Sequence, residues 1–282
     1  MGFPLQLAIE VERNVLAALA EDIGGGDLTA LLTPASHVSR GLVISRENAT
    51  LCGAAWFDAC FHRLDTSASI TWHAQDGELI GAGQTLCEVQ ADTRTLLTAE
   101  RTALNFLQLL SGTATMTRRY VDIIAGTTAN IVDTRKTLPG LRLAQKYAVR
   151  TGGGINHRLG LYDGILIKEN HILAAGGIRP ALMQAQLLAK GDVFIQIEVE
   201  TLDELHESLE CGAKMILLDN MSLAEMREAV AVNAGRAELE ASGGINQERV
   251  RSIAETGVNR ISIGSLTKDV RAVDLSLRHV ER

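Results

Sequence analysis

Residues 193–219 read VFIQIEVETLDELHESLECGAKMILLD, and this stretch shows the pattern that organises the second half of the chain. Two short apolar runs, at 193–199 and 215–219, flank a segment whose apolar residues recur at helical spacing. Near-continuous Val, Ile and Leu runs are typical of strands covered on both faces, so the pattern predicts two parallel strands joined by a crossover helix. Runs of the same kind, each followed by a helical pattern, occupy 130–133, 164–168, 238–242 and 260–264.

Polar residues follow these predicted strands at the point where each strand ends. In a β/α barrel the carboxyl ends of all strands open on one face, whereas in an open doubly wound sheet they spread along an edge. Periodicity allows both arrangements, but the barrel explains more of the polar residues, so we predict a parallel β/α barrel with its active site on that face. The residues are Asp133, Thr134, Arg135, Lys136, Lys168, Glu169, Asn170, His171, Glu198, Asp219, Asn220, Ser242, Gly243, Gly244, Gly264 and Ser265.

The first part of the chain has a different pattern. Short β-rich runs separated by Gly and Asp predict an α+β domain, and apolar spacing from 95 to 124 predicts one or two long helices, with Gly112 as a candidate break. We therefore expect an N-terminal α/β sandwich with helices over 1–128 and a catalytic barrel over 129–282, with 265–282 able to pack back on the first domain. The β-rich runs are 41–45, 49–55, 69–73 and 85–89.

Composition limits the classes of partner. The length of 282 residues suits about two domains. The 27 basic and 34 acidic side chains give a net charge of −7, which argues against nucleic acid and anionic membranes as partners. No apolar run reaches 18 residues and the N-terminus is amphipathic, so we expect a cytoplasmic protein without a membrane anchor.

The cysteines fit a reducing compartment, because none of the four forms a CxxC pair. Cys52, Cys60 and His62 lie close together in the sequence, which raises the alternative of a zinc site. They sit in or beside the apolar segment LCGAAWFDAC, where cysteine behaves as a small core residue. We expect core packing there and assign no zinc.

Residues 133–171 concentrate basic side chains within an acidic protein. A guanidinium binds a carboxylate through two parallel hydrogen bonds, so two or three arginines can orient a dicarboxylate. For Arg142, Lys146 and Arg150, which recur at helical spacing, a solvated helix face is the alternative. The basic set is Arg135, Lys136, Arg142, Lys146, Arg150, His157, Arg158 and Lys168.

Two carboxylates stand at the ends of neighbouring predicted strands. Glu198 interrupts an apolar run, where an unpaired carboxylate is costly, and Asp219 ends the next run. Together they can hold a hydrated Mg²⁺ or sugar hydroxyls. Salt bridges to Lys136 or Lys168 are the alternative.

The last two predicted units end in small residues. Backbone N–H groups that no Cβ shields can bind phosphate, and barrels commonly use their last two loops for this purpose. The run GGGIN at 152–156 lacks the GxGxxG arrangement after a strand, so we do not assign dinucleotide binding to it. The predicted phosphate site consists of Ser242, Gly243, Gly244, Gly264 and Ser265.

Eight segments carry a resemblance to a known family: EDIGGGDLTA (21–30), AERTALNFLQLLSGTAT (99–115), DTRKT (133–137), KYAVRTGGGINHR (146–158), LIKENH (166–171), IEVET (197–201), LLDNM (217–221) and ASGGIN (241–246). In this order they closely resemble the quinolinate phosphoribosyltransferases. The resemblance implies an N-terminal open-faced α/β sandwich, a C-terminal barrel of fewer than eight strands, and a homodimer or higher homo-oligomer with shared active sites.

The same resemblance implies a decarboxylating glycosyltransferase of de novo NAD biosynthesis. Its reaction converts quinolinate and 5-phosphoribosyl-1-diphosphate to nicotinate mononucleotide, CO₂ and diphosphate. It needs Mg²⁺ and no organic cofactor.

The resemblance also implies roles for individual residues. The quinolinate carboxylates would be held by Arg135, His157 and Arg158, and by Arg101 from the neighbouring subunit. The catalytic residues would be Lys136 and Lys168, which neutralise substrate and diphosphate charge, and Glu198 and Asp219, near the ribose and the metal. The 5-phosphate would be lined by Ser242, Gly243, Gly244, Gly264 and Ser265. The family pattern Ala-Leu-Thr-His is replaced here by Ser265-Leu266-Thr267-Lys268, which leaves the role of Lys268 open.

Three alternatives remain at this stage. A molybdate-associated paralogue of the same family is one, although the segment LIKENH favours the quinolinate enzyme. A sugar-phosphate isomerase or synthase on a phosphate-binding barrel is the second, and a catalytically silent binding protein is the third. Release of CO₂ from quinolinate would separate the quinolinate enzyme from all three.

Overall fold

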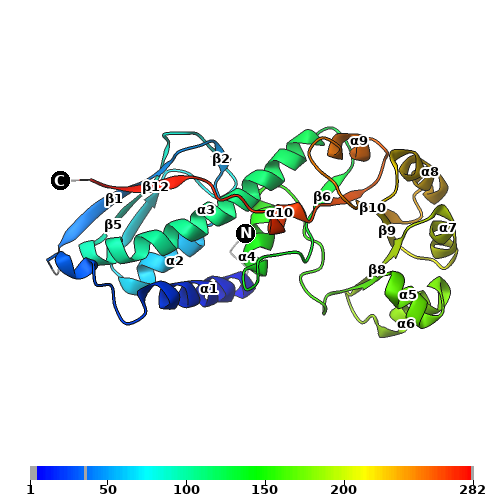
Figure 1. Cartoon of the computed structure of the whole chain (residues 1–282), viewed down its shortest axis with the longest axis horizontal. Coiled ribbons are helices and arrows are strands. Elements are labelled where there is room, and N and C mark those ends of the chain that lie inside the picture. The colour runs from blue at the N-terminus through cyan, green and yellow to red at the C-terminus, as the bar shows by residue number, and fades with distance from the viewer. Residues whose placement is uncertain (1–4, 35–36, 281–282) are drawn as a thin grey trace. The chain divides into compact units, whose positions relative to one another are not determined.

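The computed structural model describes residues 5–34 and 37–280, and it divides into two compact units (Figure 1). The first unit holds the described residues up to Arg118, Thr137–Gly153 and the described residues from Leu266 on. The second holds Arg119–Lys136 and Gly154–Ser265. The division into domains 1–128 and 129–282 stays a prediction.

The first unit is built on an antiparallel sheet whose order, among the described residues, is β12-β1-β5-β3. Its strands are β1 (Val38–Ser45), β3 (Ser69–Trp72), β5 (Thr85–Asp92) and β12 (Leu275–Val280), and a separate ladder joins β2 (Ala49–Thr50) to β4 (Leu79–Ile80). The helical elements of this unit are α1 (Leu5–Ile23), the turn Ala30–Leu32, α2 (Ala54–Leu64), the first part of α3 (Thr93–Ile123), α4 (Arg142–Thr151) and, beginning at the unit boundary, α10 (Ser265–Lys268). Figure 1 shows α1, α2 and α3 on one side of the sheet, as an open-faced sandwich requires.

The core of the first unit centres on α2. Its residues Trp56, Phe57 and Phe61 are fully buried, and burial of such side chains contributes roughly 1.5 to 3 kcal/mol each. Cys52 and Cys60 are buried in the same cluster, in line with the expected core packing. Burial raises the pKa of the Cys60 thiol to about 12, so it stays protonated at neutral pH.

The run at 49–55, predicted as a strand, is a strand over Ala49–Thr50 and then turns into α2. Gly53 takes a left-handed conformation, with φ of 114°, which ends the extended chain. The Asp76 carboxylate then accepts hydrogen bonds from the Gly53 and Ala54 amides at 3.0 and 3.2 Å, which caps the new helix. The prediction was wrong because it could not include Asp76, which is distant in sequence.

Helix α3 is continuous through Gly112, so the candidate break is also wrong. The glycine has a packing role instead. A Cβ at this position would lie 2.3 Å from the carbonyl oxygen of Arg271, closer than any real contact. Gly112 therefore lets the chain pass close against α3 just before it enters β12.

The second unit contains a parallel sheet whose order, within the described residues, is β6-β11-β10-β9-β8-β7. Each of the six predicted runs forms one of these strands: β6 (Asn130–Val132), β7 (Gly164–Ile167), β8 (Phe194–Val199), β9 (Met215–Asp219), β10 (Glu238–Ser242) and β11 (Arg260–Ser262). Figure 1 shows the sheet curled, with helices on its outer side: α5 (Glu169–Ala175), α6 (Ile178–Leu188), α7 (Leu202–Glu210), α8 (Leu223–Asn233) and α9 (Val250–Ala254). The predicted fold class, a C-terminal parallel β/α barrel of fewer than eight strands with an N-terminal α+β open-faced sandwich, is confirmed.

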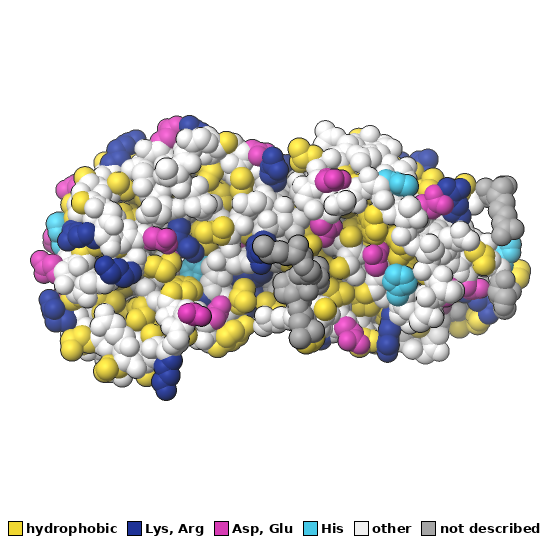
Figure 2. Space-filling model, turned by 180° about the vertical axis from the view of Figure 1, so that it is seen from behind, with side chains coloured by type: hydrophobic (Ala, Val, Ile, Leu, Met, Phe, Trp, Pro, Cys, Tyr) yellow, Lys and Arg dark blue, Asp and Glu magenta, His cyan; other side chains and the backbone are white. Residues whose placement is uncertain are grey.

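The surface has no strong segregation of charge on the face seen in Figure 2. Lys and Arg side chains are interspersed there with Asp and Glu among the residues that the structure describes. None of the helices within 5–34 and 37–280 is both long and apolar enough to cross a membrane.

Candidate active site

A pocket of about 170 Å³ opens among the inward-facing side chains of the second unit. Its walls come from the strands β7 to β11 and from the loops that follow β6 and Ile155. The lining residues are Thr134, Arg135, Lys136, His157, Arg158, Leu166, Lys168, Glu198, Leu217, Glu240, Ser242 and Ser262. Seven of these were predicted as site residues, and the structure brings them together.

Strand register explains why these side chains meet. Glu198 pairs with Leu217 and Leu217 pairs with Glu240, so the three share one face of the parallel sheet. Side chains alternate between faces, so the positions two residues further along, Asp219 and Ser242, face the same side. The pocket thus has a layer centred on Glu240 beneath a layer at the strand ends.

Two arginines whose charges interact, Arg135 and Arg158, line the pocket. Burial lowers the pKa of the Arg158 guanidinium, and the like charge of Arg135 lowers it further, while Asp163 acts in the opposite direction. The Nε of Arg135 is buried and finds no hydrogen-bond partner among the described residues. Two neighbouring guanidiniums, one with an unused N–H, are suited to binding an anion with more than one carboxylate.

Lys168 and Glu198 form an ion pair on one wall of the pocket, with 2.8 Å between Nζ and Oε2. Lys168 lies at the N-terminal end of α5, directly after β7, and its side chain is half exposed, whereas that of Glu198 is 13% exposed. This is the salt bridge that the sequence offered as an alternative to a metal or sugar contact for Glu198. A charged ligand has to compete with this pair for both groups.

Asp219 ends β9 and accepts a hydrogen bond from the Asn220 side-chain amide at 2.8 Å. It is outside the set of described residues that line the pocket. Asn220 lies very close to Gly243, the residue that follows the next strand, because a Cβ on Gly243 would lie 2.0 Å from Asn220 Oδ1. Gly243, with φ of 103°, is therefore required for the close approach of the two strand ends.

Of the predicted phosphate residues, Ser242 lines the pocket and the other four do not. A Cβ on Gly264 would lie 3.1 Å from Cδ of Lys136, so this glycine leaves room for the lysine. Gly244 has φ of 56° and open space around it, and Ser265 begins α10. Their contact with phosphate stays a prediction.

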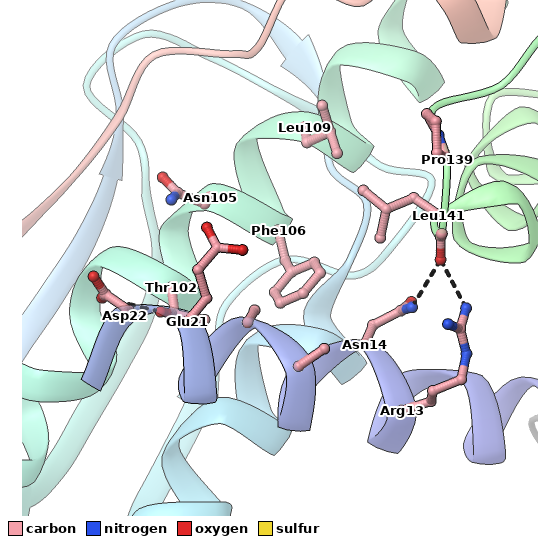
Figure 3. A pocket seen from close by; sticks show the side chains of 13 residues that line it. Arg13, Asn14, Glu21, Asp22, Thr102, Asn105, Phe106, Leu109, Pro139 and Leu141 are labelled. Carbon is pink, nitrogen blue, oxygen red and sulfur yellow. Dashed lines mark hydrogen bonds between the residues drawn. The ribbon is translucent and has the colours of Figure 1, made fainter. Parts of the chain in front are cut away.

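Arg101 belongs to the first unit, where it is exposed on α3. Nearby residues of α3 line a second pocket, of about 400 Å³, together with α1 and residues 139–141 (Figure 3). Arg13 and Asn14 both donate hydrogen bonds to the carbonyl oxygen of Gly140, at 2.7 and 3.1 Å. This larger pocket lacks the paired cations of the second unit, so its size does not make it the better candidate for an anionic substrate.

The basic residues at helical spacing lie on α4, also in the first unit. Lys146 is only 1% exposed, whereas Arg150 is exposed. The alternative of a solvated helix face is therefore wrong for Lys146.

Residues 27–111 match the model of the quinolinate phosphoribosyl transferase N-terminal domain, and residues 113–278 match that of the C-terminal domain. The chain belongs to the quinolinate phosphoribosyltransferase family. It is 41% identical over 257 residues to a probable nicotinate-nucleotide pyrophosphorylase (carboxylating) of Bacillus subtilis, covering 91% of this chain and 89% of that protein. A nicotinate-nucleotide pyrophosphorylase (carboxylating) of Mycobacterium leprae is 42% identical over 274 residues, covering 94% and 95%.

The fold gives the same family assignment. The structure of the nicotinate-nucleotide pyrophosphorylase from Francisella tularensis superimposes with a TM-score of 0.94 at 43% identity. The superposition covers 99% of this chain and 98% of that one.

Sequence reasoning missed Glu240, which lines the pocket, and its hydrogen-bond partner Gln196. Both are completely buried, and Glu240 accepts a hydrogen bond from Arg260 Nε at 2.9 Å. The alternation in the run ELEAS held the signal, because Glu240 is two residues before the predicted site residue Ser242 and so shares its face. A buried carboxylate is acceptable there only with a partner such as Arg260, which lies on the next strand.

Proposed function

We propose that this protein is a quinolinate phosphoribosyltransferase that makes nicotinate mononucleotide, CO₂ and diphosphate from quinolinate and 5-phosphoribosyl-1-diphosphate, in NAD biosynthesis. The observation that carries the proposal is the pairing of Arg135 with Arg158 in a pocket that also holds Lys136, Lys168 and Glu198. Family membership and the names of the relatives support the same reaction.

Quinolinate carries two adjacent carboxylates on a pyridine ring. Arg135 and Arg158 supply the planar N–H donors that bind such groups in pairs, and His157 lies beside them. Binding of the dianion also offsets the repulsion between the two guanidiniums. The two arginines therefore hold the base and present its ring nitrogen to the ribose.

The ribosyl centre becomes positively charged as diphosphate departs, as in glycoside cleavage. Glu198 can stabilise this charge, while Lys168 and Lys136 stabilise the departing anion. The ion pair between Lys168 and Glu198 places the two opposite charges on the same wall of the pocket before the substrate arrives.

The bond from the ribosyl carbon to the ring nitrogen leaves the pyridine cationic. The carboxylate next to this nitrogen can then leave as CO₂, with the bonding electrons drawn into the ring and a proton from solvent replacing it. The ring itself is the electron sink, so the proposal includes no organic cofactor.

We include Mg²⁺ in the proposal because the donor set suits it. Mg²⁺ is typically held by one or two carboxylates plus substrate phosphates. Glu198 and Asp219 stand on one face of adjacent strands, while the described residues contain no cluster of three or more metal-ligating side chains. Bound there, Mg²⁺ would neutralise diphosphate charge.

A homodimer or higher homo-oligomer with shared sites is part of the proposal. Arg101 is exposed on α3 and lies one helical turn from Asn105, which lines the groove in Figure 3. A guanidinium displayed in this way can complete the quinolinate site of a neighbouring subunit. Mixed oligomers of Arg101→Ala and Lys136→Ala subunits should then regain part of the activity, and absence of any recovery would count against shared sites.

The test of the function is an assay of purified protein with quinolinate, phosphoribosyl diphosphate and Mg²⁺. We expect release of CO₂ and formation of nicotinate mononucleotide, and no product when nicotinate replaces quinolinate. Product from nicotinate alone would assign the protein to a different phosphoribosyl transfer. We place the reaction in the cytoplasm, in keeping with four cysteines that form no CxxC pair.

A further inference from the structure

A series of hydrogen bonds links four side chains, of which Glu240 and His157 line the pocket and Glu240, Gln196 and His157 are buried. Arg260 Nε donates to Glu240 Oε2 at 2.9 Å, and Gln196 Nε2 donates to the same oxygen at 3.1 Å. The other end of the Gln196 amide, Oε1, lies 2.6 Å from Nε2 of His157. Such an interior is normally filled by branched apolar side chains, so a polar chain here needs a reason.

The order of donors and acceptors along these hydrogen bonds determines which ring nitrogen of His157 carries the proton. Its Nδ1 accepts a hydrogen bond from the backbone amide of Arg158 at 2.8 Å, so Nδ1 carries no proton. The ring proton must then be on Nε2, where it is donated to Gln196. In this geometry His157 is a neutral imidazole with a single tautomer.

Glu240 sets that direction. A carboxylate paired with Arg260 only accepts hydrogen bonds, so it draws the NH₂ group of Gln196 toward itself. The carbonyl oxygen of Gln196 is thereby turned to His157 and requires an N–H from the ring. With an amide in place of the carboxylate, the Gln196 side chain could reverse, and its NH₂ group would face Nε2.

Two further contacts hold the backbone and the ring of His157 in place. Its backbone amide donates to the buried Asp133 carboxylate at 2.8 Å, and the Phe194 ring packs edge-on with centroids 5.6 Å apart. The ring is thus fixed in place while the chain from Glu240 fixes its proton. Through Nδ1 the same ring orients the backbone of Arg158, which carries one of the two guanidiniums of the pocket.

We propose that Glu240 and Gln196 are positioning residues that hold His157 in its neutral Nε2–H form and thereby orient Arg158 for quinolinate. The tautomer rests on the contacts above, and the effect on quinolinate rests on the proposed function. A neutral ring adds no third positive charge beside Arg135 and Arg158, whose mutual repulsion already disfavours the empty site.

The first experiment observes the proton directly. Two-bond ¹H–¹⁵N correlation spectra of the ¹⁵N-histidine-labelled protein, with His157 assigned by its loss in His157→Asn, should show a neutral ring protonated at Nε2 at pH 7.5. A ring protonated at Nδ1, or an imidazolium, would overturn the proposal. An imidazolium would mean that the ring pairs instead with Glu240 Oε1, which lies 3.8 Å from Nε2.

The second experiment uses a matched pair of variants on one strand. Glu240→Gln and Glu238→Gln make the same chemical change, and both carboxylates contact Arg260. Glu238, however, is exposed and has no part in the hydrogen bonds that lead to His157. Loss of one ordering hydrogen bond predicts a rise in the KM for quinolinate of about three- to tenfold for Glu240→Gln. The KM for phosphoribosyl diphosphate should stay within about twofold, and Glu238→Gln should change neither constant.

A structural role alone would reduce kcat or the amount of folded enzyme without this split between the two KM values, so such a result would overturn the proposal. If Glu240→Gln does not fold, Gln196→Met keeps the volume, removes the link to His157 and should give the same split. The wild-type spectrum decides the tautomer in any case. A protein that releases no CO₂ from quinolinate would refute the proposed function while leaving that spectrum interpretable.

Discussion

Arg135→Ala is expected to weaken quinolinate binding by about 10- to 150-fold. The buried Nε of Arg135 has no hydrogen-bond partner within the described part of the chain, so its donors are available to the ligand. A hydrogen bond between charged groups contributes about 1.5 to 3 kcal/mol, and each 1.4 kcal/mol corresponds to a factor of ten in Kd. We count one such bond, because loss of a second is offset by relief of the repulsion from Arg158.

The assay is isothermal titration calorimetry of quinolinate into the free protein. Arg135→Lys is the matched control, since it keeps the charge and loses the planar fork, and it should bind with intermediate affinity. Thermal unfolding should change little, because the alanine leaves no buried group unpaired. Unchanged quinolinate affinity in Arg135→Ala would refute the placement of the base against Arg135 and Arg158.

Three further outcomes are expected. Gly243→Ala should lower the free energy of unfolding in urea by roughly 1 to 3 kcal/mol, because its Cβ would overlap Asn220. Gly244→Ala, which has open space around it, should lower it by about 1 kcal/mol, and equal effects of the two variants would contradict the packing argument. Native-state alkylation at pH 8 should label the partly exposed Cys211 and spare Cys60, since a thiol with its pKa raised to about 12 forms almost no thiolate at that pH, and rapid labelling of Cys60 would disprove its burial. Chelation of divalent cations should abolish CO₂ release and added Mg²⁺ should restore it, while full activity in chelator would remove Mg²⁺ from the mechanism.

Much of the second unit could be predicted from the sequence because its strands are short, apolar and regularly spaced. The runs at 215–219 and 238–242 match β9 and β10 residue for residue. Some of the residues at strand ends, among them Arg135, Lys168 and Glu198, likewise line one pocket, because parallel strands bring their carboxyl ends to one face, whereas Asp219 does not line it. The local sequence pattern is sufficient to predict a strand wherever its periodicity agrees with the tertiary environment of the strand.

The failures share a different cause, which is contact between segments far apart in the chain. The helix start at Ala54 depends on Asp76, and the role of Gly112 depends on the backbone of Arg271. Glu240 was missed because a buried glutamate is acceptable only with its partners, and Arg260 is one strand away. Patterns among neighbouring residues in the sequence do not predict such distant partners.

The position of β12 at the end of the sequence affects how the first sheet folds during translation. It pairs with β1 from Arg40↔Val280 to Ser45↔Leu275, so the first sheet lacks one edge until residues 275–280 have been synthesised. During translation the nascent chain must therefore carry an incomplete N-terminal sheet, with an open edge, while the whole parallel unit emerges from the ribosome. A stall or truncation shortly before β12 would leave that edge available for aggregation, even though every group of the pocket had already been made.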